Sequence, residues 1–550
     1  MSLPRTALSR LVPLLVVAAV TLLVYWTCRS PVSEGAKAEA GSSPADLRVT
    51  VERLNAEFQR QWSFEHLTPA PPASNLQVFR RLSLALHGSV PSLEEIRRFE
   101  SDAQTLSGDE LLQLWTRRLL ADERFHAYFA ERFARAFVGT EGTPFILFRR
   151  DRFVQWLREQ LRQGTPYDAV VREIISQTGI WTDRPATNFL TSGLVENELD
   201  ENKLAGRTVR AFLGQRIDCA QCHDHPFEEW KQSHFQGLAA FYGQTKLSIV
   251  GMEDRSLDKG EPVVYRVEDR KTLEKRIVDE AVPFHPEWLP AEGSRRARLA
   301  TWITHRENRR FERATANRVW ALLFGRAWHE PVDDLRNPPD GQSDILDILG
   351  RDFREHGCDL RRLIQIIALS EPFRLDSALP VSSDGTSSEK LTTAWAAFPL
   401  IRLRPEQVIG SILQSSTVQT TDQNSHLFFR FIRFVQGEEF LKEYGDLGAD
   451  ELLARGGTIP QRLLLMNGKL ASEAMEVGPI TAAGRISGMS SSPEHVVETA
   501  YLVCLTRRPT PEEKAHFVNQ LTIAPKVEHG KVVEDLCWSL VNSTEFAWNH

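Results

Sequence analysis

Residues 76–95 read LQVFRRLSLALHGSVPSLEE, and this stretch predicts a helix, a sharp break and the start of a second helix. Apolar residues recur at helical spacing as far as Leu86. Gly88 then closes the helix, because glycine accepts the left-handed conformation that commonly follows a last turn. Ser92 stands three residues before Glu95, which is the pattern of a capping box at a helix start. The stretch therefore predicts a body built from short, well-capped helices.

The same helical periodicity extends over most of residues 47–245 and 291–550. Residues 246–290 differ, because Val263–Val267 alternates and is bounded by Gly and Pro, as in short strands. We therefore predict a mainly α fold with two helical domains, 47–245 and 291–550, and a minor β element in the connecting segment 246–290. The clearest helices are expected at residues 76–86, 110–120, 123–137, 149–163, 167–176, 295–304, 313–324, 344–355, 360–369, 405–414, 459–468, 495–505 and 511–521.

The first 28 residues resemble a targeting element. Two arginines, Arg5 and Arg10, precede the uncharged apolar run LVPLLVVAAVTLLVYW at residues 11–26. About 17 residues are the lower limit for a helix that crosses a bilayer, and this run lies at that limit. The arginines favour the cytoplasmic side, which predicts a transmembrane signal anchor over 1–28, a polar linker over 29–46 and a periplasmic body at the inner membrane. A cleaved signal peptide is the alternative, and it also exports the body.

The composition bounds the class of protein. The chain has 550 residues, of which 42% are hydrophobic and 25% are charged, enough for real cores. Its net charge of −7 comes from mixed acidic and basic residues, which argues against nucleic acid as a partner. Six cysteines are too few for a disulfide scaffold of this length.

The most informative motif is CAQCH at residues 219–223. Cys219 and Cys222 have the spacing that attaches c-type haem covalently, and His223 then supplies an axial ligand to the iron. This attachment occurs outside the cytoplasm, so the motif and the predicted export support each other. Two alternatives remain, namely a disulfide between the cysteines and a zinc ion held by these three residues with His225.

Other residues would complete a haem site. Met252, His234 and His285 are candidates for the second axial ligand, although each also fits a structural role. Aromatic residues follow the motif and could form an apolar wall for a porphyrin or plain core. They are Phe227, Trp230, Phe235, Phe241 and Tyr242.

Pairs of like charges are less informative. Asp333-Asp334 is expected to cap the following helix, with a catalytic carboxylate role as the alternative. Arg80-Arg81 is expected on a solvated or carboxylate-paired face.

Ordered blocks along the chain resemble a planctomycete cytochrome-associated family with two paired domains of unknown function. In the first half they are FRRL at 79–82, HGSVPS at 87–92, FLG at 212–214, CAQCHDHPF at 219–227 and LAAFY at 238–242. In the second half they are RLATW at 298–302, ANRVW at 316–320, FGR at 324–326, DDLRN at 333–337, IPQ at 459–461, RRPT at 507–510 and NSTEF at 542–546. The resemblance implies this architecture, export and a haem, and it supplies no reaction.

Three functional hypotheses follow. The first is a membrane-anchored protein with haem c at Cys219, Cys222 and His223 that transfers electrons to a redox partner protein or performs redox chemistry. The second is a binding or scaffold protein in which zinc or a disulfide staples the motif. The third is a component of extracytoplasmic polysaccharide degradation that uses Asp333 and Asp334.

Overall fold

The structure is a computed structural model that describes residues 44–140, 147–196, 198–226, 229–258, 260–268, 273–336, 344–378, 388–421, 444–445, 452, 457–478, 481–489 and 492–550. The predicted membrane segment, residues 1–28, and the linker as far as residue 43 lie outside this set. Among the described helices, none combines the length and the apolar character that a bilayer crossing requires.

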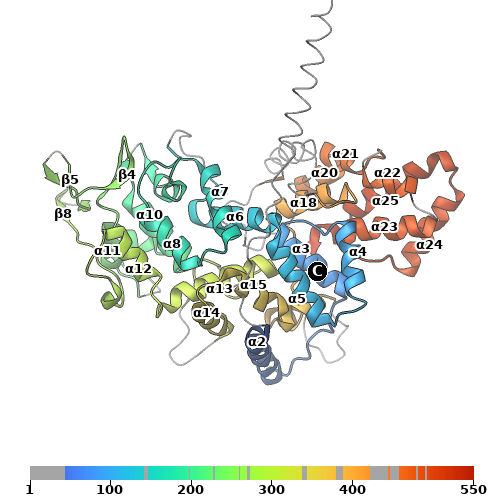
Figure 1. Cartoon of the computed structure of the whole chain (residues 1–550), viewed down its shortest axis with the longest axis horizontal. Helices are drawn as coiled ribbons and strands as arrows, with labels where there is room; N and C mark the ends of the chain where they lie inside the picture. The colour runs from blue at the N-terminus through green and yellow to red at the C-terminus, as the bar shows by residue number, and fades with distance from the viewer. Residues whose placement is uncertain are drawn as a thin grey trace, which may run out of the picture. The chain divides into compact units, whose positions relative to one another are not determined.

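The described chain is mainly helical, as predicted (Figure 1). The helices of the first half are α2 (Pro44–Phe64), α3 (Asn75–His87), α4 (Leu93–Asp102), α5 (Gly108–Ala121), α6 (Glu123–Val138), α7 (Arg150–Gln163), α8 (Tyr167–Ser176), α9 (Asn188–Thr191), α10 (Glu201–Phe212) and α11 (Gln232–Ala240). Those of the second half are α12 (Arg295–Ile303), α13 (Arg309–Phe324), α14 (Ile345–Glu355), α15 (Leu360–Leu369), α16 (Glu371–Arg374), α17 (Ser388–Thr393), α18 (Pro405–Ser415), α20 (Ile459–Asn467), α21 (Lys469–Met475), α22 (Ala482–Met489), α23 (Pro493–Leu505), α24 (Pro511–Ile523) and α25 (His529–Val541).

Short antiparallel pairs make up the strands of the described chain. They are β1 (Leu194–Val195) with β2 (Glu198–Leu199), β3 (Thr245–Ser248) with β4 (Gly251–Asp254), β5 (Leu257–Asp258) with β6 (Glu261–Pro262), β7 (Arg266–Glu268) with β8 (Lys275–Ile277), and β9 (Ile401–Arg402) with β10 (Trp548–Asn549). The predicted minor β element is confirmed, since β3 to β8 fall within residues 245–277. In the β3–β4 pair, Thr245 stands opposite Asp254 and Ser248 opposite Gly251.

Helix α3 forms where the sequence of residues 76–86 predicts a helix. Gly88 ends the helix in the left-handed region at φ 68°, and an added Cβ there would meet the Tyr128 ring at 2.4 Å. Ser92 and Glu95 form the predicted capping box at the start of α4. Every residue from Val78 to His87 is buried, so α3 is enclosed on all sides.

Two apolar clusters explain this burial. The larger cluster runs from Leu47 to Phe398 and also takes in Leu452 and Leu502. The smaller is built mainly from residues 403–546 and includes Leu84 of α3. Because α3 contributes to both clusters, it lies between them, and the apolar packing divides near residue 400.

Contacts also cross the predicted boundary at 246–290. Helix α2 packs against α14 and α15, and the Thr50 hydroxyl donates to Asp352 at 2.7 Å. Ser43–His550 accordingly clusters as one compact unit. The division into domains at 47–245 and 291–550 stays a prediction.

The interpretation of Arg80-Arg81 as a solvated or carboxylate-paired face was wrong. Both side chains are fully buried and donate to backbone carbonyls. Arg80 reaches Phe546 O at 3.2 Å, and Arg81 reaches Leu375 O at 2.6 Å. Burial lowers the pKa of Arg80 to about 10 and that of Arg81 to about 9. These guanidinium groups therefore tie α3 to segments near residues 375 and 546.

Candidate functional site

The predicted motif lies in a short loop after α10. Its first residues form the 3-10 helix η2 (Asp218–Gln221), which is anchored by the fully buried side chain of Ala220. Residues three apart lie on the same side of such a helix, so Cys219 and Cys222 share one side of the loop. Both are exposed thiols. The loop therefore presents two neighbouring, accessible sulfur atoms.

The ring of His223 is oriented by its own backbone. Its Nδ1 lies 2.7 Å from the carbonyl oxygen of Asp224, and because a carbonyl only accepts, Nδ1 carries the proton and donates. The lone pair of His223 is then on Nε2. The residue is exposed, so an imidazole of fixed tautomer is available as a ligand.

The start of α11 holds the loop in place. The Gln232 backbone N–H donates to Asp224 Oδ1 at 2.8 Å, and its side-chain amide donates to the carbonyls of Cys222 at 3.1 Å and Gln221 at 3.3 Å. The His225 N–H donates to Trp230 O at 2.7 Å. The motif backbone is thus fixed by the residues that follow it.

A zinc site would require the ligand atoms of the motif to converge. Within the described part of the chain, the one group of three or more such atoms within 4.8 Å of one another is His87, Glu95 and Asp122. The guanidinium of Arg124 pairs with both carboxylates of this group, at 2.5 and 2.7 Å. The possible ligand atoms of the motif therefore do not converge on one point. The group around His87 does converge, but its two carboxylates are already paired with the side chain of Arg124.

The candidate second axial ligands lie in two different environments. Met252 is fully buried in β4, within the larger apolar cluster. His234 and His285 line a cavity of about 470 Å³, where His285 stacks on Trp288 with ring centroids 4.0 Å apart. Burial and the charge of Lys231 lower the pKa of His234. Its partial burial thus favours the neutral, ligating form of His234.

The aromatic residues after the motif belong to the core. Trp230, Phe235, Phe241 and Tyr242 are buried in the larger apolar cluster, and Phe227 lies outside the described residues. Trp230 also lines the cavity of about 470 Å³. Trp230 therefore combines a core position with a place in the wall of this cavity.

The sequence predicted that Asp333 and Asp334 cap the following helix. This prediction was wrong, because Asp344 caps α14. Asp333 accepts from the Arg216 guanidinium at 2.9 Å. Asp334 Oδ1 accepts from the Arg216 backbone N–H and the Gln215 amide, both at 3.1 Å. The two aspartates therefore hold Gln215 and Arg216, which lead into the motif, through hydrogen bonds. This role is visible only in the folded chain.

Comparison with known proteins gives two matches along the chain. Residues 53–247 match the family model PSCyt2, described as a protein of unknown function (DUF1549). Residues 295–434 match the family model PSD1, described as a protein of unknown function (DUF1553). No curated protein and no solved structure matches the chain.

The chain therefore carries regions that match two domains of unknown function, one after the other. The CAQCH motif at residues 219–223 lies in the first match, and Asp333-Asp334 lies in the second. The hydrogen bonds from Gln215 and Arg216 to the two aspartates thus connect the two matched regions directly beside the motif.

Proposed function

We propose that this chain carries a c-type haem bound covalently through Cys219 and Cys222, with His223 as an axial ligand, and acts in electron transfer or redox chemistry. One observation carries the proposal. The Nδ1–H of His223 donates to Asp224 O, which leaves the Nε2 lone pair of an exposed ring for the iron. The accessible thiols on one side of the same loop supply the attachment points.

The residues of the loop would have separate roles in holding the haem. Cys219 and Cys222 would hold the haem covalently, and His223 would supply a ligand to its iron. Gln232 holds the carbonyls of Gln221 and Cys222, which limits movement of the ligand relative to the thiols. When bound, the haem supplies a redox-active iron.

The zinc alternative has less support from the geometry. A structural zinc ion needs four ligand atoms at a tetrahedral spacing. Cys219, Cys222, His223 and His225 do not make a group of three or more within 4.8 Å among the described residues. Haem attachment needs no such convergence, because the cysteines bond to the porphyrin and a single imidazole reaches the iron.

The proposed function includes a location. We infer from residues 1–28 that the body is anchored in the inner membrane and faces the periplasm, where covalent haem attachment takes place. Membrane lipid and a redox partner protein are then its proposed partners.

Substitution of the axial ligand tests the proposal. The full-length chain is produced in a host with c-type cytochrome maturation, together with His223→Ala and the control His516→Ala, which changes an exposed ring on α24. The His223→Ala protein is expected to keep covalent haem and lose the low-spin absorption spectrum of the parent, because the attachment survives and the ligand is gone. The control is expected to match the parent. A His223→Ala spectrum and metal content identical to the parent would show that His223 is no axial ligand.

A further inference from the structure

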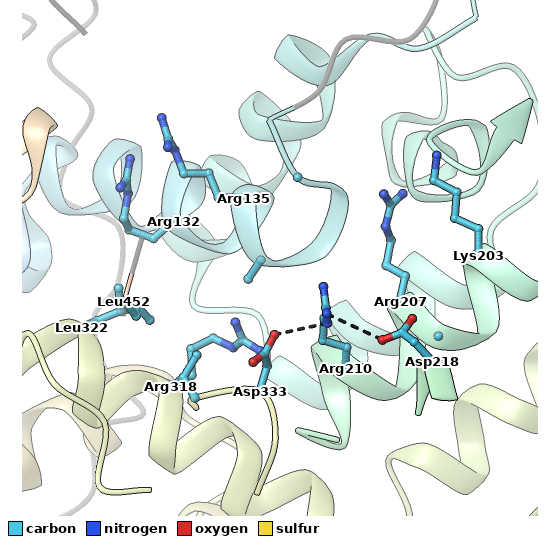
Figure 2. A pocket seen from close by; sticks show the side chains of 14 residues that line it. Arg132, Arg135, Lys203, Arg207, Arg210, Asp218, Arg318, Leu322, Asp333 and Leu452 are labelled. Atoms are coloured by element: carbon cyan, nitrogen blue, oxygen red, sulfur yellow. Dashed lines mark ion pairs between the residues drawn. The ribbon is translucent and has the colours of Figure 1, made fainter. Parts of the chain in front are cut away.

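A second cavity, of about 200 Å³, lies between α6, α10 and α13 (Figure 2). It is unusual in its charge, because six cationic side chains line it beside only two carboxylates. The cations are Arg132, Arg135, Lys203, Arg207, Arg210 and Arg318, and the carboxylates are Asp218 and Asp333. Cationic side chains therefore dominate the wall of the cavity.

The cations come from helix positions that bring like charges together. Lys203, Arg207 and Arg210 are four and then three residues apart, so they share one face of α10. Arg132 and Arg135 share a face of α6 in the same way. Like charges at these spacings repel and destabilise a helix. Such clustering is typical of a site where an anion compensates the charge.

Carboxylates of the protein balance part of this charge. Arg132 pairs with Glu406, and Arg135 pairs with Glu131 at 3.0 Å. Figure 2 shows Arg210 between Asp333 and Asp218, at 3.3 and 3.7 Å. The Asp218 side chain is about two-thirds exposed, so its attraction to Arg210 is weakened by solvent.

Two of the cations have no carboxylate partner in the described part of the chain. The Lys203 side chain forms no ion pair there. Arg318 is only 6% exposed, and its guanidinium donates to the neutral carbonyl of Ala211 at 3.3 Å. A buried guanidinium beside further cations is costly unless a negative charge accompanies it.

We propose that this cavity binds a tetrahedral oxyanion group, phosphate or sulfate, as a free ion or as an ester on a larger ligand. Arginine presents donors in a planar fork that matches the oxygens of such groups, and lysine adds a point charge. The volume holds more than a water molecule and is smaller than a pocket for a drug-sized ligand, which limits the bound part to a small group. Asp218 links the cavity to the haem motif, because it precedes Cys219 directly. The proposal uses none of the residues that would hold the haem.

Calorimetric titration of the full-length chain with sodium sulfate and with sodium phosphate, at constant ionic strength, tests the proposal. Saturable binding of at least one anion is expected. Lys203→Gln and Arg207→Gln should each weaken it by about tenfold, as expected for the loss of one charge-assisted contact. Arg117→Gln, which removes an exposed cation from α5, should bind like the parent. Lys203→Gln breaks no ion pair among the described residues, so its circular dichroism and melting temperature should match the parent.

Monoesters distinguish the two sources of the group. Methyl phosphate and methyl sulfate should bind as tightly as the ions if the natural ligand is an ester, and more weakly if it is a free ion. The same titration on a Cys219→Ser/Cys222→Ser variant should give unchanged affinity, which separates this proposal from the haem proposal. Absence of saturable binding by either anion would overturn the oxyanion site. Equal affinities in the parent, Lys203→Gln and Arg207→Gln would do the same.

Discussion

His223 and His87 are two histidines with opposite surroundings. Each has one ring nitrogen beside a backbone carbonyl, Nδ1 beside Asp224 in the first case and Nε2 beside Leu119 in the second. The remaining nitrogen of His223 belongs to an exposed ring, whereas Nδ1 of His87 is buried without a hydrogen-bond partner. The same side chain is therefore available as a ligand in one region and enclosed in the other.

The two regions also differ in what accompanies the imidazole. Around His87, Glu95 and Asp122 converge, but Arg124 already neutralises both carboxylates. Around His223, the accompanying groups are thiols. Convergence of possible ligand atoms does not by itself indicate a metal site around His87, because the Arg124 guanidinium already pairs with both carboxylates.

The largest expected effect concerns the thiols. A Cys219→Ser/Cys222→Ser variant should lose covalent haem completely, because no thioether can form. Haem staining of the denatured, electrophoresed protein measures this loss. A Cys358→Ser variant, changed outside the motif, should retain the full signal. Covalent haem in the double variant would place the attachment elsewhere in the chain.

Removal of the cation near His87 should have the next largest effect. Arg124→Met leaves two carboxylates without their buried partner, which should cost about 3–5 kcal/mol of unfolding free energy at pH 7. Arg124→Lys should lose less unfolding free energy, since the ammonium keeps the positive charge. It cannot reproduce the contacts that the guanidinium makes with both carboxylates. Urea titration gives the values, with Arg117→Met as the exposed control. A loss below about 1 kcal/mol in Arg124→Met would contradict the structural role of this cluster.

His87 itself should make stability depend on pH. Burial is the largest cause that lowers its pKa to about 4, from an ordinary value near 6.5. Between these values the unfolded chain binds more protons, so the free energy of unfolding falls as pH falls from 6.5 to 4. The difference corresponds to about 3 kcal/mol. His87→Gln should remove this contribution, which urea titrations of both proteins across that range would show as a flatter pH profile. Parallel profiles would contradict the assignment to His87.

The smallest expected effect concerns the hydrogen bonds that Asp334 accepts from Gln215 and Arg216, next to the motif. Asp334→Ala removes the acceptor for Arg216 N–H and the Gln215 amide, which should cost about 2 kcal/mol. Asp334→Asn keeps an oxygen acceptor and should cost less than about 1 kcal/mol. Both values come from urea titration. Equal losses in the two variants would show that the charge of Asp334, and not its acceptor oxygen, holds the segment.

Local signals in the sequence predicted much of the fold. The capping residues Ser92 and Glu95 and the break at Gly88 lie where helices start and end, because these effects act within a few residues. The exposed loop of Cys219 and Cys222 is also local, so its spacing alone identified a candidate site.

Effects between distant segments could not be predicted in this way. Arg80 and Arg81 are buried because carbonyls near residues 375 and 546 accept from them, and nothing near them in sequence signals that contact. The cationic cavity likewise joins α6, α10 and α13, whose separate charges look like ordinary surface residues. Such sites depend on the tertiary fold.

The proposed function depends above all on a haem, and not a zinc ion, at residues 219–223. The most direct test is a pyridine haemochrome spectrum of the full-length protein, purified from a host with c-type cytochrome maturation, alongside zinc analysis of the same sample. We predict the spectrum of a covalently attached haem, at a haem-to-chain ratio near one, with little zinc. Zinc at a ratio near one, with no haemochrome signal, would contradict it.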